Sequence, residues 1–153
     1  MSHRDDTLEA VRRSVAEVAA PRAALRAAMQ ALAERHAHYE WVGIYVLRGD
    51  ELDLEAFVGQ ATEHVAIPVG KGVCGTAVAR RANQLVTDVR DLDNYIACSE
   101  SVRSEIVVLI WHQGEIVGQI DADCDAVGAF DAGDEALLSR VAEILGPVVA
   151  GLL

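Results

Sequence analysis

Two pairs of β-rich runs, each folded back over a short polar turn, constrain the fold of this chain more than any other feature. The first pair spans residues 41–58 and turns at Arg48-Gly49-Asp50-Glu51. The second pair joins residues 105–112 to 115–123 through Gln113-Gly114. Runs rich in β-branched and aromatic residues around a short glycine-containing turn are typical of antiparallel hairpins. We therefore expect a largely antiparallel sheet.

Helices are predicted on both sides of these hairpins. Residues 7–37 are rich in Ala, Leu, Arg and Glu, and Thr7 is suited to cap the start of a helix. Pro21 interrupts this segment, so we expect two helices that meet at the proline. A last helix is expected over residues 131–153, with Asp131 as its cap. Its apolar stripe consists of Leu137, Leu138, Val141, Ile144, Leu145 and Val148.

Shorter elements connect the two hairpins. Residues 65–69 and 84–88 are predicted to be short strands, and a glycine-rich loop after the first of them opens a helix that runs to about Arg81. Residues 90–103 are polar and irregular and are interpreted as a surface loop. The predicted fold class is α+β: a central, largely antiparallel sheet of about six strands, with the terminal helices on one face and ligand-pocket loops on the other.

Length and composition suit one domain without a membrane segment. The 153 residues divide into N-terminal helices (1–38), a sheet and pocket segment (39–130) and a C-terminal helix (131–153). No apolar run reaches the roughly 18 residues of a membrane span, and the first residues lack the apolar core of a signal peptide, so a cytoplasmic location is expected. The net charge of −11 disfavours nucleic acids and anionic membranes as partners.

Three cysteines are present, Cys74, Cys98 and Cys124. An odd number without a secretion signal favours free thiols over a disulfide framework. Cys98 lies on the polar loop, and an exposed reactive thiol and a small buried hydrophobe are equally good interpretations of it. Cys74 lies at a predicted helix start, where it either packs or has a lowered thiol pKa. The histidines show no paired ligand spacing, so no metal site is expected.

Three carboxylates lie at the ends of the second hairpin. Asp121 and Asp123 share one face of their strand, and the hairpin brings Glu105 beside them. Like charges this close raise at least one carboxyl pKa, and a carboxyl group that stays neutral can donate a proton. The alternative, which spacing alone slightly favours, is a solvated strand edge that discourages pairing between sheets.

Three further side chains follow from the same alternation. Cys124 comes directly after Asp123 and so faces the opposite side of the sheet, which favours a buried structural role. Trp41 and Tyr45 lie four residues apart on one strand and face the same way. They are either core residues or an aromatic wall for a small apolar group.

Five motifs, in chain order, resemble those of the free methionine-R-sulfoxide reductases, which are stand-alone GAF domains. The resemblance extends from about residue 41 to 131 and implies a GAF fold. The motifs are Trp41-Val-Gly-Ile-Tyr45, Gly70-Lys-Gly-Val-Cys-Gly-Thr-Ala77, Tyr95-Ile-Ala-Cys98, Ser104-Glu-Ile-Val107 and Ile120-Asp-Ala-Asp123.

The resemblance implies thiol-dependent reduction of free L-methionine-R-sulfoxide to L-methionine. Cys98 is then the nucleophile that becomes a sulfenic acid, and Cys74 is the resolving thiol that forms a disulfide with it. It implies no bound cofactor, because an external dithiol protein of the thioredoxin type would reduce the disulfide. Glu105, Asp121 and Asp123 would hold the substrate's ammonium group and sulfoxide oxygen, with Trp41 and Tyr45 around the S-methyl end.

The chain departs from the family at two cysteine positions. Many members have a cysteine where this chain has His64, which argues against a relay of three cysteines and leaves the Cys74–Cys98 pair. Cys124 stands where serine is common, which makes it a candidate auxiliary thiol. The alternative functions are a non-catalytic GAF module that binds a small ligand and a thiol redox sensor. A homodimer packed through the Ala- and Leu-rich terminal helices is a further expectation.

Overall fold

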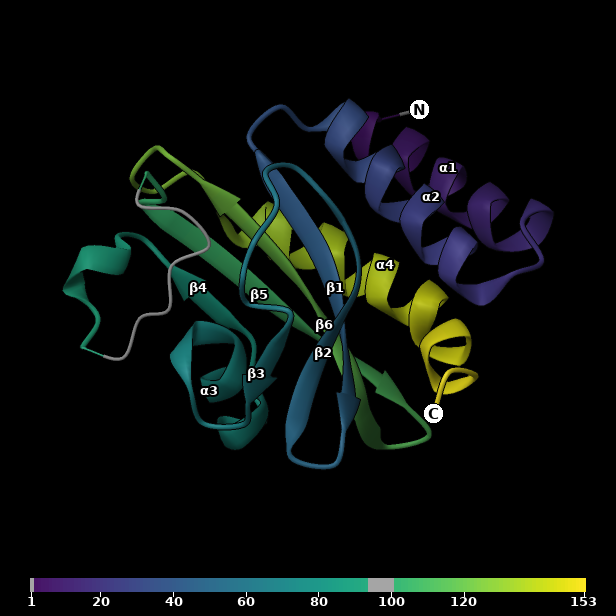
Figure 1. Ribbon diagram of the computed structural model, residues 1–153. Helices are drawn as coiled ribbons and strands as arrows, with labels where there is room; N and C mark the ends of the chain where they lie inside the picture. The colour runs from purple at the N-terminus through teal and green to yellow at the C-terminus, as the bar shows by residue number, and fades with distance from the viewer. Residues whose placement is uncertain (1, 94–100) are drawn as a thin grey trace.

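A six-stranded sheet, antiparallel throughout, forms the centre of the computed structural model, which describes residues 2–93 and 101–153 (Figure 1). Its strand order is β3-β2-β1-β6-β5-β4. The two predicted hairpins are confirmed as β1–β2 and β5–β6, and they join edge to edge because β1 pairs with β6. The strands are β1 (Trp41–Arg48), β2 (Glu51–Val58), β3 (Ala66–Pro68), β4 (Gln84–Val86), β5 (Ser104–His112) and β6 (Glu115–Cys124).

The helices lie on the two faces of this sheet in unequal numbers. Figure 1 shows α1 (His3–Glu17), α2 (Pro21–Arg35) and α4 (Ala132–Ala150) on one side, and the short helix α3 (Gly72–Arg80) on the other. A single turn of 3₁₀ helix (Val89–Asp91) follows β4. Among the described residues, no helix is long and apolar enough to cross a membrane. The predicted α+β class is confirmed.

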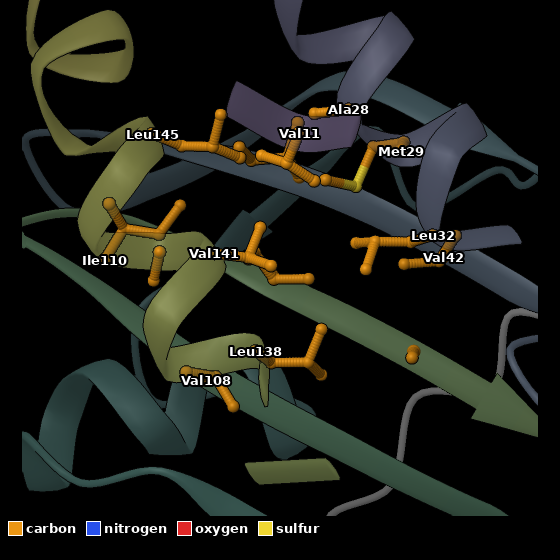
Figure 2. Packing of buried hydrophobic residues seen from close by; sticks show 14 of the residues in the cluster. Val11, Ala28, Met29, Leu32, Val42, Val108, Ile110, Leu138, Val141 and Leu145 are labelled. Atoms are coloured by element: carbon orange, nitrogen blue, oxygen red, sulfur yellow. The ribbon is translucent and has the colours of Figure 1, made fainter. Parts of the chain in front are cut away.

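The main core lies between the sheet and the three longer helices. Figure 2 shows side chains of α1, α2 and α4 meeting those of β1 and β5. Val11, Met29 and Leu138 are fully buried there, as are Val42 and Ile110. Each large apolar side chain buried in this way contributes about 1.5–3 kcal/mol. This layer fixes the sheet, so that its other face can carry polar groups.

The start of the first helix differs from the prediction. Thr7 is not its cap, because α1 begins at His3 and Ser2 is the cap residue. The Ser2 hydroxyl accepts from the Asp5 backbone N–H, and the Asp5 carboxylate accepts from the Ser2 backbone N–H, which forms a capping box. Thr7 is buried instead, and its hydroxyl donates to the carbonyl of His3. The predicted cap of α4, Asp131, is confirmed.

Candidate active site

The three carboxylates lie in the interior of the sheet. β6 runs between β1 and β5, and Asp123 stands directly opposite Glu105 on one side and Trp41 on the other. Glu105, Asp121 and Asp123 are only 4%, 1% and 1% exposed. The alternative of a solvated strand edge is therefore wrong, because β6 is a central strand with neighbours on both sides.

Gly43 leaves the space that the Trp41 indole occupies beside these acids. Gly43 lies across from Asp121 on the neighbouring strand. A Cβ atom at Gly43 would be 2.4 Å from the indole of Trp41, so the ring occupies the space where a side chain would stand. The indole also stacks on Phe57 and donates its N–H to the carbonyl of Gln60. Trp41 and Tyr45 face the same way, with ring centroids 6.5 Å apart.

Helix α3 brings Cys74 over the acids. Cys74 lies in the first turn of this helix, and its Sγ is 3.8 Å from Oε2 of Glu105, to which the thiol donates. Gln119 holds the same turn against the sheet, because its amide Nε2 donates to the Cys74 carbonyl at 3.3 Å. Gly75 allows the close approach, since a Cβ there would be 2.5 Å from the carbonyl of Pro68.

The surroundings of Cys74 decide between its two interpretations, packing at a helix start and a lowered thiol pKa. Burial raises that pKa well above its ordinary value, and the neighbouring carboxylates of Asp121, Glu105 and Asp123 raise it further. The prediction of a lowered pKa at a helix start is wrong, because loss of hydration and three acids outweigh the partial positive charge of the helix end. Cys74 is therefore a protonated thiol near neutral pH.

Asp121 confirms the expectation of a raised carboxyl pKa. Burial is the main cause of its raised pKa, and hydrogen bonding with Glu105 and Cys74 offsets part of it. In the described part of the chain, no backbone N–H, hydroxyl or basic side chain donates to either carboxylate oxygen of Asp121. A carboxylate without such donors is strongly disfavoured when buried, so Asp121 is suited to hold a proton.

The predicted pocket residues divide between two cavities. Tyr45, Cys74, Glu105 and Asp121 line a narrow cavity under α3, together with His64, Ile67, Lys71, Gly72 and Val73. Trp41 and Asp123 line a second cavity at the end of β6, with Glu40, Gln60, Ser101, Val102, Cys124 and Asp125. The expectation of one pocket with all five predicted binding residues is therefore corrected to two separate cavities, each lined by residues of β1 and β6.

Of the other two cysteines, the structure describes Cys124 alone. Cys124 faces the helix-covered side, as alternation predicted, and only 6% of it is exposed. Burial and a hydrogen bond with Glu40 raise the pKa of its thiol. Cys98 lies outside the described residues, so its separation from Cys74 stays a prediction.

Sequence reasoning missed two residues of the site. Gln119 is fully buried on β6, on the same face as Asp121 and Asp123, and spaced two residues from Asp121. Strand alternation was the signal that would have found it. His64 contributes to the site with its backbone, because its carbonyl accepts a hydrogen bond of 2.9 Å from the Tyr45 hydroxyl. A backbone contact of this kind leaves no pattern in the sequence.

Comparison with known proteins assigns the family. The GAF domain family model matches residues 18–150. The free methionine-R-sulfoxide reductase of Escherichia coli is 41% identical over 119 residues, which cover 78% of this chain and 72% of the relative. The chain belongs to the free methionine-R-sulfoxide reductase family of GAF domains.

Solved structures of this family agree with the fold. The type II free methionine-R-sulfoxide reductase of Thermoplasma acidophilum has a TM-score of 0.83 and 44% identity, over 86% of this chain and 93% of that chain. The enzyme of Neisseria meningitidis in complex with its substrate has a TM-score of 0.89 and 34% identity, over 96% and 88%. The GAF fold implied by the sequence motifs is confirmed.

Proposed function

We propose that this protein reduces free L-methionine-R-sulfoxide to L-methionine. The observation that carries the proposal is the buried cluster of one thiol and three acids, Cys74 with Glu105, Asp121 and Asp123, in a chain of this family. A buried carboxyl group with a raised pKa is a proton donor, and a buried thiol beside a carboxylate is a nucleophile with its base next to it.

The proposed first step takes the sulfoxide oxygen to Cys98. The Cys98 thiolate attacks the sulfoxide sulfur while a neutral carboxyl group, Asp121 by its environment, protonates the oxygen. This attack forms a bond between the Cys98 sulfur and the substrate sulfur. That new bond and the sulfur–oxygen bond of the substrate both break as the protonated oxygen moves to the Cys98 sulfur, which becomes a sulfenic acid. The substrate sulfur gains two electrons and Cys98 loses two, so free methionine leaves.

The proposed second step uses Cys74 as the resolving thiol. Its raised pKa means that the proton must be removed during attack, and Glu105, whose Oε2 lies 3.8 Å from the sulfur, is a base in position to take it. The Cys74 sulfur attacks the sulfenic acid, water leaves, and a Cys74–Cys98 disulfide forms. A dithiol protein of the thioredoxin type then returns two electrons and two protons. A cytoplasmic location belongs to this proposal, since such reductants keep thiols reduced there.

Charge and shape support free methionine sulfoxide as the substrate. The substrate's ammonium group is a cation, and the acidic cluster is suited to it, with Glu105 and Asp123 as the buried negative charges and Asp121 as the group that holds the proton. In the proposed complex the aromatic rings of Trp41 and Tyr45 pack against the S-methyl end. Binding of the cation also lowers the repulsion that opposes a thiolate in this cluster.

The test supplies each resolved epimer of free L-methionine sulfoxide with dithiothreitol. Wild type is expected to consume the R epimer alone, and Cys98→Ser to lose that activity. Cys74→Ser is expected to reduce one equivalent quickly and then to turn over slowly. Cys124→Ser is the matched control, because that thiol lies on the opposite face, and it is expected to keep wild-type turnover. Absence of turnover with either epimer would refute the proposal and favour a ligand-binding or redox-sensing module.

A further inference from the structure

We propose that the cluster of Cys74, Glu105 and Asp121 is also a binding site for a thiophilic divalent cation, Zn²⁺ in the first place. The ligand atoms of these three residues all lie within 4.8 Å of one another, and all three residues are buried. They come from three separate elements, α3, β5 and β6. This is why no ligand spacing is visible in the sequence.

The distances in the cluster suit a tetrahedral zinc ion. Bonds of roughly 2.3 Å to sulfur and 2.0 Å to oxygen place the two ligand atoms roughly 3.5 Å apart. The Cys74 sulfur and Oε2 of Glu105 are 3.8 Å apart, so an adjustment of a few tenths of an ångström brings both onto one ion. Water completes the four ligands of such a site.

Asp121 points to a ligand independently of that geometry. Its carboxylate is 1% exposed and lies on the wall of the narrow cavity that Cys74 and Glu105 also line. Among residues 2–93 and 101–153, no hydroxyl, basic side chain or backbone N–H donates to its oxygens. A buried carboxylate in this condition is stabilised either by a proton or by a cation.

The donor set selects the class of cation. One thiolate with two carboxylates is a mixed sulfur and oxygen set, which suits Zn²⁺ and its spectroscopic substitute Co²⁺. Mg²⁺ and Ca²⁺ prefer oxygen ligands alone and are not expected to bind. On binding, the thiol proton of Cys74 and any proton shared by the two carboxyl groups leave to the solvent, and no electrons are transferred.

The consequence for activity rests on the proposed function. If Cys74 is the resolving thiol, a zinc-bound Cys74 cannot attack the sulfenic acid, and zinc inhibits turnover until the metal is removed. The metal site itself does not depend on that function, because binding is measured without substrate.

A second cluster in the described part of the chain supplies the matched control. The ligand atoms of Glu40, Cys124 and Asp125 also lie within 4.8 Å of one another. Here two of the three residues are exposed, and Glu40 already accepts a hydrogen bond of 2.6 Å from the backbone N–H of Asp125. This cluster therefore contains no buried carboxylate, and we expect it to bind zinc weakly.

The experiment titrates Co²⁺ and then Zn²⁺ into chelator-treated protein, kept reduced by a phosphine so that no added thiol competes for metal. Wild type is expected to bind one Co²⁺ with a thiolate-to-cobalt charge-transfer band, which Zn²⁺ removes. Cys74→Ser is expected to lose the band, and Asp121→Asn, of unchanged shape, to weaken binding by at least about tenfold. Cys124→Ser is expected to match wild type. Circular dichroism spectra confirm that each variant is folded.

Two results would overturn the metal site. One is a charge-transfer band that persists in Cys74→Ser or disappears in Cys124→Ser, which would place the metal on a thiol other than Cys74. The other is a wild-type protein without a band at millimolar Co²⁺. If the band appears as expected but neither epimer is turned over, the metal site stands and the proposed function fails, so the two failures are distinguishable.

Discussion

Burial of His36 makes the stability of this protein dependent on pH. His36 follows α2 and is 7% exposed, with its Nε2 at 2.8 Å from the Thr7 hydroxyl. That hydroxyl donates its proton to the His3 carbonyl, so its oxygen accepts from Nε2–H of a neutral imidazole. The ring stacks on Tyr39, with centroids 5.0 Å apart, and the ring of His38 lies 6.0 Å away.

These surroundings lower the pKa of His36 from 6.5 to about 4. Burial is the largest cause, followed by the charges of His3, His38 and Arg4, and Asp134 acts in the opposite direction. Because the folded pKa is below the unfolded one, the unfolded chain binds more protons between them. Stability is therefore lost as the pH falls below about 6.5. From about pH 7.5 to about pH 4.5 the loss is about 2–3 kcal/mol of unfolding free energy.

The measurement is urea unfolding at both pH values for wild type and for His36→Gln, which keeps a neutral donor of similar size. The variant is expected to lose about 2–3 kcal/mol less than wild type over this range. His3→Gln is the control, and it is expected to keep most of the wild-type dependence, because burial and not His3 dominates the shift. Equal losses in wild type and His36→Gln would refute the reasoning.

Three further changes test the site and its support. Gly43→Ala is expected to raise KM for methionine sulfoxide, because the new Cβ would lie 2.4 Å from the indole of Trp41 and 3.2 Å from the backbone oxygen of Ala56, so that the ring must shift. Gly118→Ala is expected to lower stability by several kcal/mol in urea unfolding, since its Cβ would lie 2.3 Å from a backbone oxygen of β1, which cannot yield. Gln119→Leu removes the hydrogen bond to the Cys74 carbonyl and is expected to slow disulfide formation in a quenched single-turnover assay, with KM unchanged. An unaltered rate of disulfide formation would show that Gln119 does not position this thiol.

Local signals predicted most of the elements of the fold. Both hairpins follow from their turn residues, and the break between α1 and α2 falls at Pro21 as expected. The start of α1 was missed because two cap residues compete there. Thr7 directly precedes the run of residues that most favour a helix. Ser2, however, is followed three residues later by Asp5, and these two residues cap each other's backbone N–H groups in a capping box.

The burial of the acids could not be predicted in the same way. Alternation predicts which face Asp121 and Asp123 share, but burial depends on whether β6 is an edge strand. That is decided by the pairing of β1 with β6, between residues about 80 positions apart. No short-range pattern reports such a pairing. Because β6 is a central strand and α3 covers its face, Asp121 and Asp123 are shielded from solvent.

The raised pKa of Cys74 follows from the same long-range packing. A helix start alone favours a thiolate, which is why the sequence suggested an activated sulfur. The structure adds burial and three carboxylates, and the result is a thiol that stays protonated until a partner appears. Such a thiol is protected from oxidation, because reactivity follows the thiolate. In the proposed reaction Cys74 would then react only when a sulfenic acid is delivered next to it and Glu105 takes its proton. A cation in the cluster would remove the same proton in the absence of substrate, which places the proposed metal site and the proposed reaction in direct competition for one sulfur.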